Sequence, residues 1–379
     1  MSKLQSWNTI TLFCILIFGF TGATLIKPDT EYSEMENRTL AQMPEATVQS
    51  VFDGSFEADY ETYLTDQFVA RDQWIGMKTA VERAMFKKES KDIYFAEDDY
   101  LIEKHTDSFT SDAAALNVRV LQQFAQQYKD TFGEAHMTFM VVPNAVKVLE
   151  EKLPPYASPY DESAYLAQIA AGLPEGTWFD AGEVLEAHDT EEIFYRTDHH
   201  WTTKAAFYVY QEWAGERGLT VPTETDYHIV TVTEEFEGTI QSKLGIDTRK
   251  DTIELYKQTE DIFYTVQKNG AEDVEYSLYD ESALGTKSKY DVFFGGNQAR
   301  VTIKTREGNG RKILVIKDSY AHCFVPFLLS EFEEIEMIDI RYYNQKISEL
   351  IADGGYTDLL FLYNASGFAE DTSISRLTY

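Results

Sequence analysis

Asp198, His200 and Ser319 have the side chains that a nucleophilic acyl-transfer triad requires. Asp198 and His200 lie close together in one short stretch, and Ser319 follows an apolar run that ends in Lys317-Asp318. In such a triad a histidine removes the proton from the serine hydroxyl, and a carboxylate orients and stabilises that histidine. We therefore predict Ser319 as the nucleophile, His200 as the general base and Asp198 as its orienting partner.

The same residues also have ordinary structural interpretations. A serine before a helix most often caps it, and an Asp–His pair in a loop often belongs to a turn. A metal site formed by Asp198, His199 and His200 is a further alternative. Adjacent side chains of an extended chain point in opposite directions, and no cysteine or third histidine stands at ligand spacing, which disfavours a metal. We expect neither a metal nor a cofactor.

Three other residues could contribute to a site. Asn144 could donate a hydrogen bond from its side-chain amide to an oxyanion, or it is an ordinary turn residue. Arg341 could bind an anionic or polyol group of a substrate, or it forms a surface ion pair. Trp201 either walls the site or belongs to the core. For His199 we expect a structural role, with its ring buried or bonded to the backbone.

Short segments typical of buried strands, at 136–142, 312–316, 334–339 and 358–363, predict the strands that must position these residues. Helical stretches separate the last three segments, and this alternation favours a mostly parallel sheet with helices on both faces. Ligands of such sheets bind beyond the carboxyl ends of the strands, where Asn144 and Ser319 stand. We expect a helix over residues 320–331, whose free first amides could stabilise an oxyanion.

Other patterns complete the prediction of local structure. Helical periodicity predicts helices at 111–132, 163–171 and 202–215, the last capped by Thr202 or Thr203. Residues 47–88 predict two helices that separate near residues 69–72. Alternation predicts a hairpin at 92–103 and a short strand at 177–179.

The N-terminal run at 9–26 contains no charged residue. As a helix it would be roughly 27 Å long, close to the hydrocarbon thickness of a bilayer. We predict an uncleaved signal anchor, with cleavage near residues 21–23 and secretion as the alternative. Lys3 favours an N-terminus inside the cell, so we expect a single-pass protein of the cell membrane with an extracytoplasmic body.

These patterns suggest three parts: a signal anchor at 1–27, a membrane-proximal stalk and helical segment at 28–90, and an α/β domain at 91–379. Within the last, β-branched and aromatic residues alternate with charges at about 227–301, which indicates a β-rich insertion. The chain has 33 Lys and Arg against 64 Asp and Glu, a formal charge of −31. This charge repels phosphate backbones and argues against a nucleic-acid partner.

The stretch Asp198-His199-His200-Trp201 resembles the signature of the bacterial DHHW proteins. These are similar to the SGNH-hydrolase-like proteins that O-acetylate alginate and other exopolysaccharides of the cell envelope. Further segments from about residue 31 to 365 resemble the same pattern: Glu36-Asn37-Arg38-Thr39-Leu40 with Pro44, Asp66-Gln67-Phe68 with Arg71-Asp72, Lys317-Asp318-Ser319-Tyr320 with Pro326-Phe327-Leu328, and Ile338-Asp339-Ile340-Arg341-Tyr342-Tyr343.

The resemblance implies a three-layer SGNH-hydrolase-like α/β fold and the roles already assigned to Ser319, His200 and Asp198. The order is permuted, because the serine comes first in ordinary SGNH hydrolases. Lys317 also replaces their glycine, and their Gly-x-Asn-Asp block is missing, so no motif identifies the oxyanion donors.

The implied activity is a membrane-anchored O-acyltransferase, usually for acetyl, or an esterase that acts on a cell-surface polysaccharide. The implied partners are that glycan and an integral membrane O-acyltransferase as acyl donor. The alternative is a non-catalytic glycan-binding or scaffold protein of an envelope assembly complex.

Overall fold

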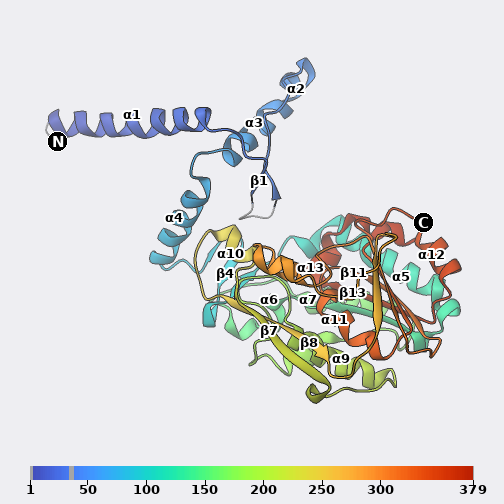
Figure 1. Ribbon diagram of the computed structural model, residues 1–379. Helices are drawn as coiled ribbons and strands as arrows, with labels where there is room; N and C mark the ends of the chain where they lie inside the picture. The colour runs from blue at the N-terminus through green and yellow to red at the C-terminus, as the bar shows by residue number, and fades with distance from the viewer. Residues whose placement is uncertain (1–2, 34–37, 379) are drawn as a thin grey trace. The chain divides into compact units, whose positions relative to one another are not determined.

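The structure, a computed structural model, describes residues 3–33 and 38–378 (Figure 1). The chain forms two compact units: Met1–Lys87 with Gln241–Asp247, and Lys88–Ile240 with Thr248–Tyr379. The larger unit contains the residues singled out for acyl transfer, and the smaller unit contains the apolar N-terminal helix.

A six-stranded sheet forms the centre of the larger unit. Its order is β6 (Met137–Val142), β13 (Asp358–Asn364), β11 (Lys312–Lys317), β12 (Glu334–Ile338), β10 (Arg300–Thr305) and β9 (Tyr264–Lys268). The first four strands are parallel to one another. At the other edge β10 pairs antiparallel with β12, and β9 pairs antiparallel with β10. The four predicted strands therefore form the expected mostly parallel sheet.

Alternate residues of each strand pack on opposite faces of this sheet. In β11, Ile313 and Val315 belong to one core, whereas Leu314 and Ile316 belong to the other. Each core is closed by helices, which gives three layers (Figure 1). The first core contains residues of α6 (Ala145–Val148), α8 (Ala181–Glu186), α9 (Thr203–Glu216) and α11 (Ala321–Phe324). The second contains residues of α5 (Asp112–Phe132), α7 (Glu162–Ala171), α12 (Ile347–Gly354) and α13 (Ala365–Glu370).

The β-rich segment divides between two sheets. β7 (Tyr227–Phe236) and β8 (Asp251–Gln258) form a separate antiparallel pair with two register shifts. β9 instead joins the central sheet through β10. Part of the predicted insertion is therefore an edge of the main sheet, because an antiparallel strand can add to an edge without a crossover helix.

A small three-stranded sheet lies before α5. It consists of β3 (Glu89–Ser90), β4 (Ile93–Phe95) and β5 (Leu101–Glu103), and a 3-10 turn at Glu97–Asp99 joins the last two. This confirms the predicted hairpin. The Leu101 amide donates to the Arg196 carbonyl, which ties the hairpin to the loop that carries Asp198 and His200.

Two local predictions are corrected. The helix expected at 320–331 is α11 followed by a 3-10 helix at Val325–Ser330, because Pro326 has no N–H to continue the α-helical pattern. The strand expected at 177–179 is a single bridge between Phe139 and Trp178.

The smaller unit is helical. It contains α1 (Lys3–Ile26), two short strands at Tyr32–Ser33 and Arg38–Thr39, and helices at Val48–Asp53, Ser55–Asp66 and Arg71–Ala84. The predicted separation near residues 69–72 is present at Ala70, which is left-handed (φ 57°). A second break at Gly54 (φ 80°) makes three helices out of the two that were expected.

The motif at 36–40 belongs to the smaller unit, and its residues 36–37 lie outside the described residues. Arg38 forms a bidentate ion pair with the buried Asp66 carboxylate, at 2.9 and 2.6 Å. The second motif therefore binds the first through charge. Within α1, Ser6–Ile26 has a mean hydropathy of 2.1 and is long and apolar enough to cross a membrane.

Ile316→Ala should lower the free energy of unfolding by about 2–5 kcal/mol, because it leaves a cavity beneath the centre of the sheet. The matched change Ile229→Ala, at a position that is 41% exposed, should change it by less than about 0.5 kcal/mol. Urea unfolding followed by circular dichroism measures both. Equal losses for the two variants would contradict the assignment of the core.

Candidate active site

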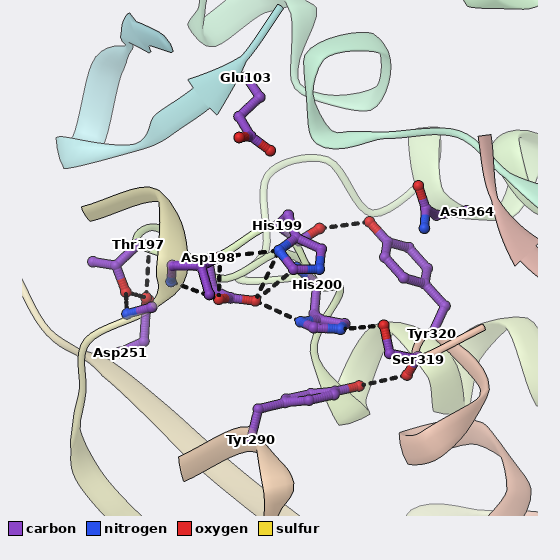
Figure 2. Close-up of polar contacts among 12 residues, drawn as sticks. Glu103, Thr197, Asp198, His199, His200, Asp251, Tyr290, Ser319, Tyr320 and Asn364 are labelled. Carbon is purple, nitrogen blue, oxygen red and sulfur yellow. Dashed lines mark hydrogen bonds and ion pairs between the residues drawn. The ribbon is translucent and has the colours of Figure 1, made fainter. Parts of the chain in front are cut away.

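The structure brings Ser319, His200 and Asp198 into one hydrogen-bonded row (Figure 2). His200 Nε2 lies 2.7 Å from Ser319 Oγ, and His200 Nδ1 lies 2.5 Å from Asp198 Oδ1. The His200 amide also donates to Asp198 Oδ1 at 3.1 Å. The ring is therefore held with one nitrogen on the carboxylate and the other on the hydroxyl.

The loop that carries Asp198 and His200 is a tight turn. Phe194 and Trp201 form an antiparallel bridge, and the Tyr195 amide donates to the His200 carbonyl. Asp251, the first residue of β8, accepts from the backbone amides of Arg196 and Thr197 at 2.9 and 2.8 Å. A carboxylate from a distant strand thus satisfies amides that a tight turn leaves without a backbone partner.

The Asp198 carboxylate is buried, and donors surround it. Its Oδ2 accepts from the Thr239 amide at 2.9 Å and from the Thr239 hydroxyl at 3.1 Å. Burial alone raises the pKa of Asp198, but attraction to His199 and His200 and these hydrogen bonds lower it below its usual range. Gly238 allows this approach, because a Cβ there would lie 2.3 Å from the Asp198 Cβ.

Ser319 lies in the turn between β11 and α11. The preceding Asp318 braces this turn, since its carboxylate accepts from the Tyr320 amide and from both the backbone and side-chain N–H groups of Asn364. Burial raises the pKa of Asp318 to about 6. Ser319 does not cap the helix, because its hydroxyl contacts His200 and the N-cap residue is Tyr320.

Trp201 is a core residue. It is fully buried, and its indole N–H donates to the Tyr320 carbonyl at 2.9 Å. In return the Tyr320 hydroxyl donates to the His199 carbonyl at 2.6 Å. These two bonds join the His200 loop to the Ser319 turn. Trp201 therefore lies in the core, which was one of its two predicted positions.

Asn144 lies at the carboxyl end of β6, as expected, and is taken up by a buried network. Its amide nitrogen donates to Asn364 Oδ1 at 3.3 Å, and its Oδ1 accepts from the Ser366 amide at 2.9 Å. The Asn144 backbone N–H donates to Glu162 at 2.9 Å. The role of Asn144 as an oxyanion donor stays a prediction.

Arg341 forms an ion pair. Its guanidinium donates two hydrogen bonds to the buried Asp339 carboxylate, at 2.8 and 2.6 Å. The fully buried Lys317 ammonium lies 3.4 Å from the same carboxylate and 2.8 Å from His322 Nε2. Burial lowers the pKa of Lys317. Arg341 thus forms the expected kind of ion pair, and its contact with a substrate stays a prediction.

His199 does not point away from His200. Their ring centroids are 4.0 Å apart, and the ligand atoms of both and of Asp198 lie within 4.8 Å of one another. The expectation of opposed side chains is wrong here, because the loop is turned and not extended. His199 Nδ1 lies 3.1 Å from the Thr239 hydroxyl, so its ring contacts a side chain of the β-rich segment. Both nitrogens of His200 are already engaged, and a metal would have to displace Asp198 or Ser319.

Several residues of the site carry no local sequence signal. Asp251, Thr239 and Tyr290 stand in the β-rich segment, where alternating charges and aromatic residues are common. Tyr290 stacks on the His200 ring (Figure 2). Only Gly238 beside Thr239 hints at a close approach of two backbones.

The larger unit is thus a three-layer α/β domain with a serine, a histidine and an aspartate at the carboxyl edge of a mostly parallel sheet. The family described as DHHW protein matches residues 105–338, which is more than half of the chain. The chain belongs to this family.

The first two of the following solved structures share the fold. A DHHW family protein from Eubacterium siraeum is 26% identical, with 76% of this chain and 96% of that chain covered and a TM-score of 0.61. Bacillus cereus PatB1, solved with a sulfonyl adduct, is 18% identical, with 74% and 98% covered and a TM-score of 0.61. The O-acetyltransferase domain of Pseudomonas putida AlgJ is 13% identical, with 75% and 98% covered and a TM-score of 0.45. No curated protein sequence matches the chain.

Glu162→Gln should change how stability depends on pH. Burial raises the pKa of Glu162 from 4.5 to about 7. Between these values the folded protein keeps a proton that the unfolded chain has lost, so this carboxyl makes stability fall as pH rises through the window. The variant lacks this contribution, and its unfolding free energy relative to wild type should rise by on the order of 2–3 kcal/mol from about pH 5 to about pH 8.

Denaturant unfolding across this pH range measures the difference. The control is Glu175→Gln, at an exposed position, for which the difference from wild type should stay constant with pH. A constant difference for Glu162→Gln as well would contradict the raised pKa.

Proposed function

We propose that the protein is a membrane-anchored, extracytoplasmic serine enzyme that acts on a cell-surface polysaccharide. Its activity would be that of an O-acyltransferase, with acetyl as the acyl group, or that of an esterase. The observation that carries this proposal is the row Asp198–His200–Ser319, with hydrogen bonds of 2.5 and 2.7 Å. Membership of the DHHW family and the likeness of this family to exopolysaccharide O-acetylating proteins support the choice of acyl group and acceptor.

The reaction has two halves in this proposal. Ser319 Oγ attacks the carbonyl carbon of the acyl donor while His200 Nε2 takes the hydroxyl proton and then gives it to the leaving group. Asp198 stabilises the imidazolium that forms. In the second half a sugar hydroxyl, or water, attacks the acyl-Ser319 ester, and His200 moves the proton of that nucleophile back to Ser319 Oγ.

The Ser319 backbone amide is the leading candidate for an oxyanion donor. The amides of Tyr320, Ala321 and His322 already donate to Asp318 Oδ1, the Asp318 carbonyl and the Ser319 carbonyl, respectively. The Ser319 amide donates to no acceptor among residues 3–33 and 38–378. It therefore remains available for the charge that develops beside the nucleophile.

The apolar helix, together with the resemblance to proteins that O-acetylate exopolysaccharides, suggests the cellular location of the protein. α1 would anchor it in the cell membrane, or be removed if the chain is secreted. The acyl donor would be an integral membrane O-acyltransferase. A strongly negative chain, with a formal charge of −31, fits a glycan partner better than a nucleic acid.

Ser319→Ala should abolish turnover of an aryl acetate, with a loss of at least about 10³-fold in kcat, because no other group replaces the nucleophile. An aryl sulfonyl fluoride should label wild type once, with the added mass on the peptide that contains Ser319. Ser158→Ala, at an exposed serine of the same unit, is the matched control and should keep both activity and labelling. A wild type that neither turns over nor labels would favour a glycan-binding or scaffold protein.

Turnover should be insensitive to chelators, because both nitrogens of His200 are engaged by Asp198 and Ser319. Hydrolysis of the aryl acetate is measured after dialysis against EDTA and against phenanthroline, with elemental analysis of the dialysed protein. A zinc esterase treated in parallel is the control. Loss of activity that returns with added metal would favour the alternative of a metal site at Asp198, His199 and His200.

A further inference from the structure

The His200 ring lies between two other aromatic rings. The Tyr290 ring stacks on it with centroids 3.8 Å apart and planes inclined by 15°, and the His199 ring is 4.0 Å away at 35°. Two rings this close cannot share one face of an imidazole, so they cover opposite faces, as Figure 2 shows. Hydrogen bonds hold the ring within its plane, and stacking prevents it from tilting out of that plane.

Tyr290 also reaches the nucleophile turn. Its hydroxyl donates to the Ser319 carbonyl at 3.3 Å. One side chain therefore touches both halves of the site, with its ring on the base and its hydroxyl on the segment that presents the nucleophile.

The surroundings of Tyr290 make it a rigid support. It lies in a 3-10 helix, Lys289–Val292, and only 6% of it is exposed. Its ring packs edge-on against Tyr195 at 6.2 Å, and it packs against Phe293 at 5.1 Å with the planes inclined by 52°. A buried aromatic ring packed on several sides has few accessible rotamers, so it transmits its position to the groups that it touches.

We propose that Tyr290 is a positioning residue of the acyl-transfer site, which aligns the His200 ring with Ser319 through stacking and holds the Ser319 turn through its hydroxyl. This inference rests on the proposed function. The face of a tyrosine ring also attracts a cation, so Tyr290 favours the imidazolium that forms when His200 takes the serine proton. The residue acts on the base and on the turn and needs no contact with substrate.

Two variants separate the two contacts. Tyr290→Phe keeps the ring and loses the hydroxyl, and its kcat should fall about two- to tenfold, as expected for one neutral hydrogen bond. Tyr290→Leu loses the ring as well, and its kcat should fall by about 10²-fold, as expected when a reacting group is misplaced. KM for the aryl acetate should stay unchanged in both, because the residue positions the catalytic groups and binds no substrate.

Tyr279 provides matched controls from the same segment. Its hydroxyl donates to the Tyr256 carbonyl, also at 3.3 Å, and its ring packs edge-on against Phe293, but it contacts none of the triad residues. Tyr279→Phe and Tyr279→Leu should therefore lower the melting temperature to a similar degree and leave kcat unchanged. If kcat falls only because stability is lost, the Tyr279 variants should show the same fall as the Tyr290 variants. That result would overturn the proposal.

A second readout does not depend on turnover. The Tyr290 ring, which stacks on His200, should shift the NMR signals of the His200 ring-carbon protons upfield. A His200→Gln variant identifies these signals. Tyr290→Leu should move them downfield, whereas Tyr290→Phe and the Tyr279 variants should not. If Tyr290→Leu does not fold, the twofold to tenfold loss in Tyr290→Phe with unmoved His200 signals is the deciding result.

The outcomes distinguish the two proposals. Unmoved His200 signals in Tyr290→Leu, or an effect on KM alone, would overturn the role of Tyr290 while Ser319→Ala could still be inactive. A wild type without turnover would end the acyl-transfer proposal, and the NMR shifts would still decide whether Tyr290 holds the His200 ring.

Discussion

The two hydrogen bonds of one imidazole ring are the constraint on which this site depends. His200 has two nitrogens, and Asp198 must occupy one of them for the other to face Ser319. The parts come from segments that are 119 residues apart, so neither can build the site alone. Much of the surrounding structure serves this alignment: Asp251 closes the His200 loop, and Asp318 braces the serine turn.

The site holds two buried carboxylates in different electrostatic surroundings. Asp198 is surrounded by two imidazoles and by the Thr239 donors, which lower its pKa and keep it charged beside His200. For Asp318 burial is the largest influence, and it raises the pKa to about 6 although Asn364 and Tyr320 donate to it. The charge that can stabilise an imidazolium is therefore the one next to the base, and Asp318 acts mainly as an acceptor that shapes the turn.

The prediction from sequence succeeded where a pattern is local. The runs at β6, β11 and β13 could be recognised because a strand buried on both faces is apolar over most of its length. β12 was recognised although Glu336 is buried in it, where it pairs with Arg300. The prediction failed where partners are distant. Nothing near Tyr264–Lys268 marks β9 as an edge of the central sheet, since strand pairing depends on the fold and not on the strand alone. The break at Gly54 was missed because periodicity continues on both sides of it.

The sequence by itself determined the chemical parts of this protein: a serine after a buried strand, an Asp-x-His stretch before a helix, and an apolar N-terminal run, each of which is a property of neighbouring residues. Only the tertiary structure decided how these parts meet. It turned the loop so that the His199 and His200 rings lie close together, and it stacked Tyr290 on the His200 ring. It also placed Trp201 in the core and engaged Asn144 and Arg341 in buried networks. The physical reason is that stacking and hydrogen bonding depend on distances between side chains, and folding sets these distances for residues that are far apart in the chain.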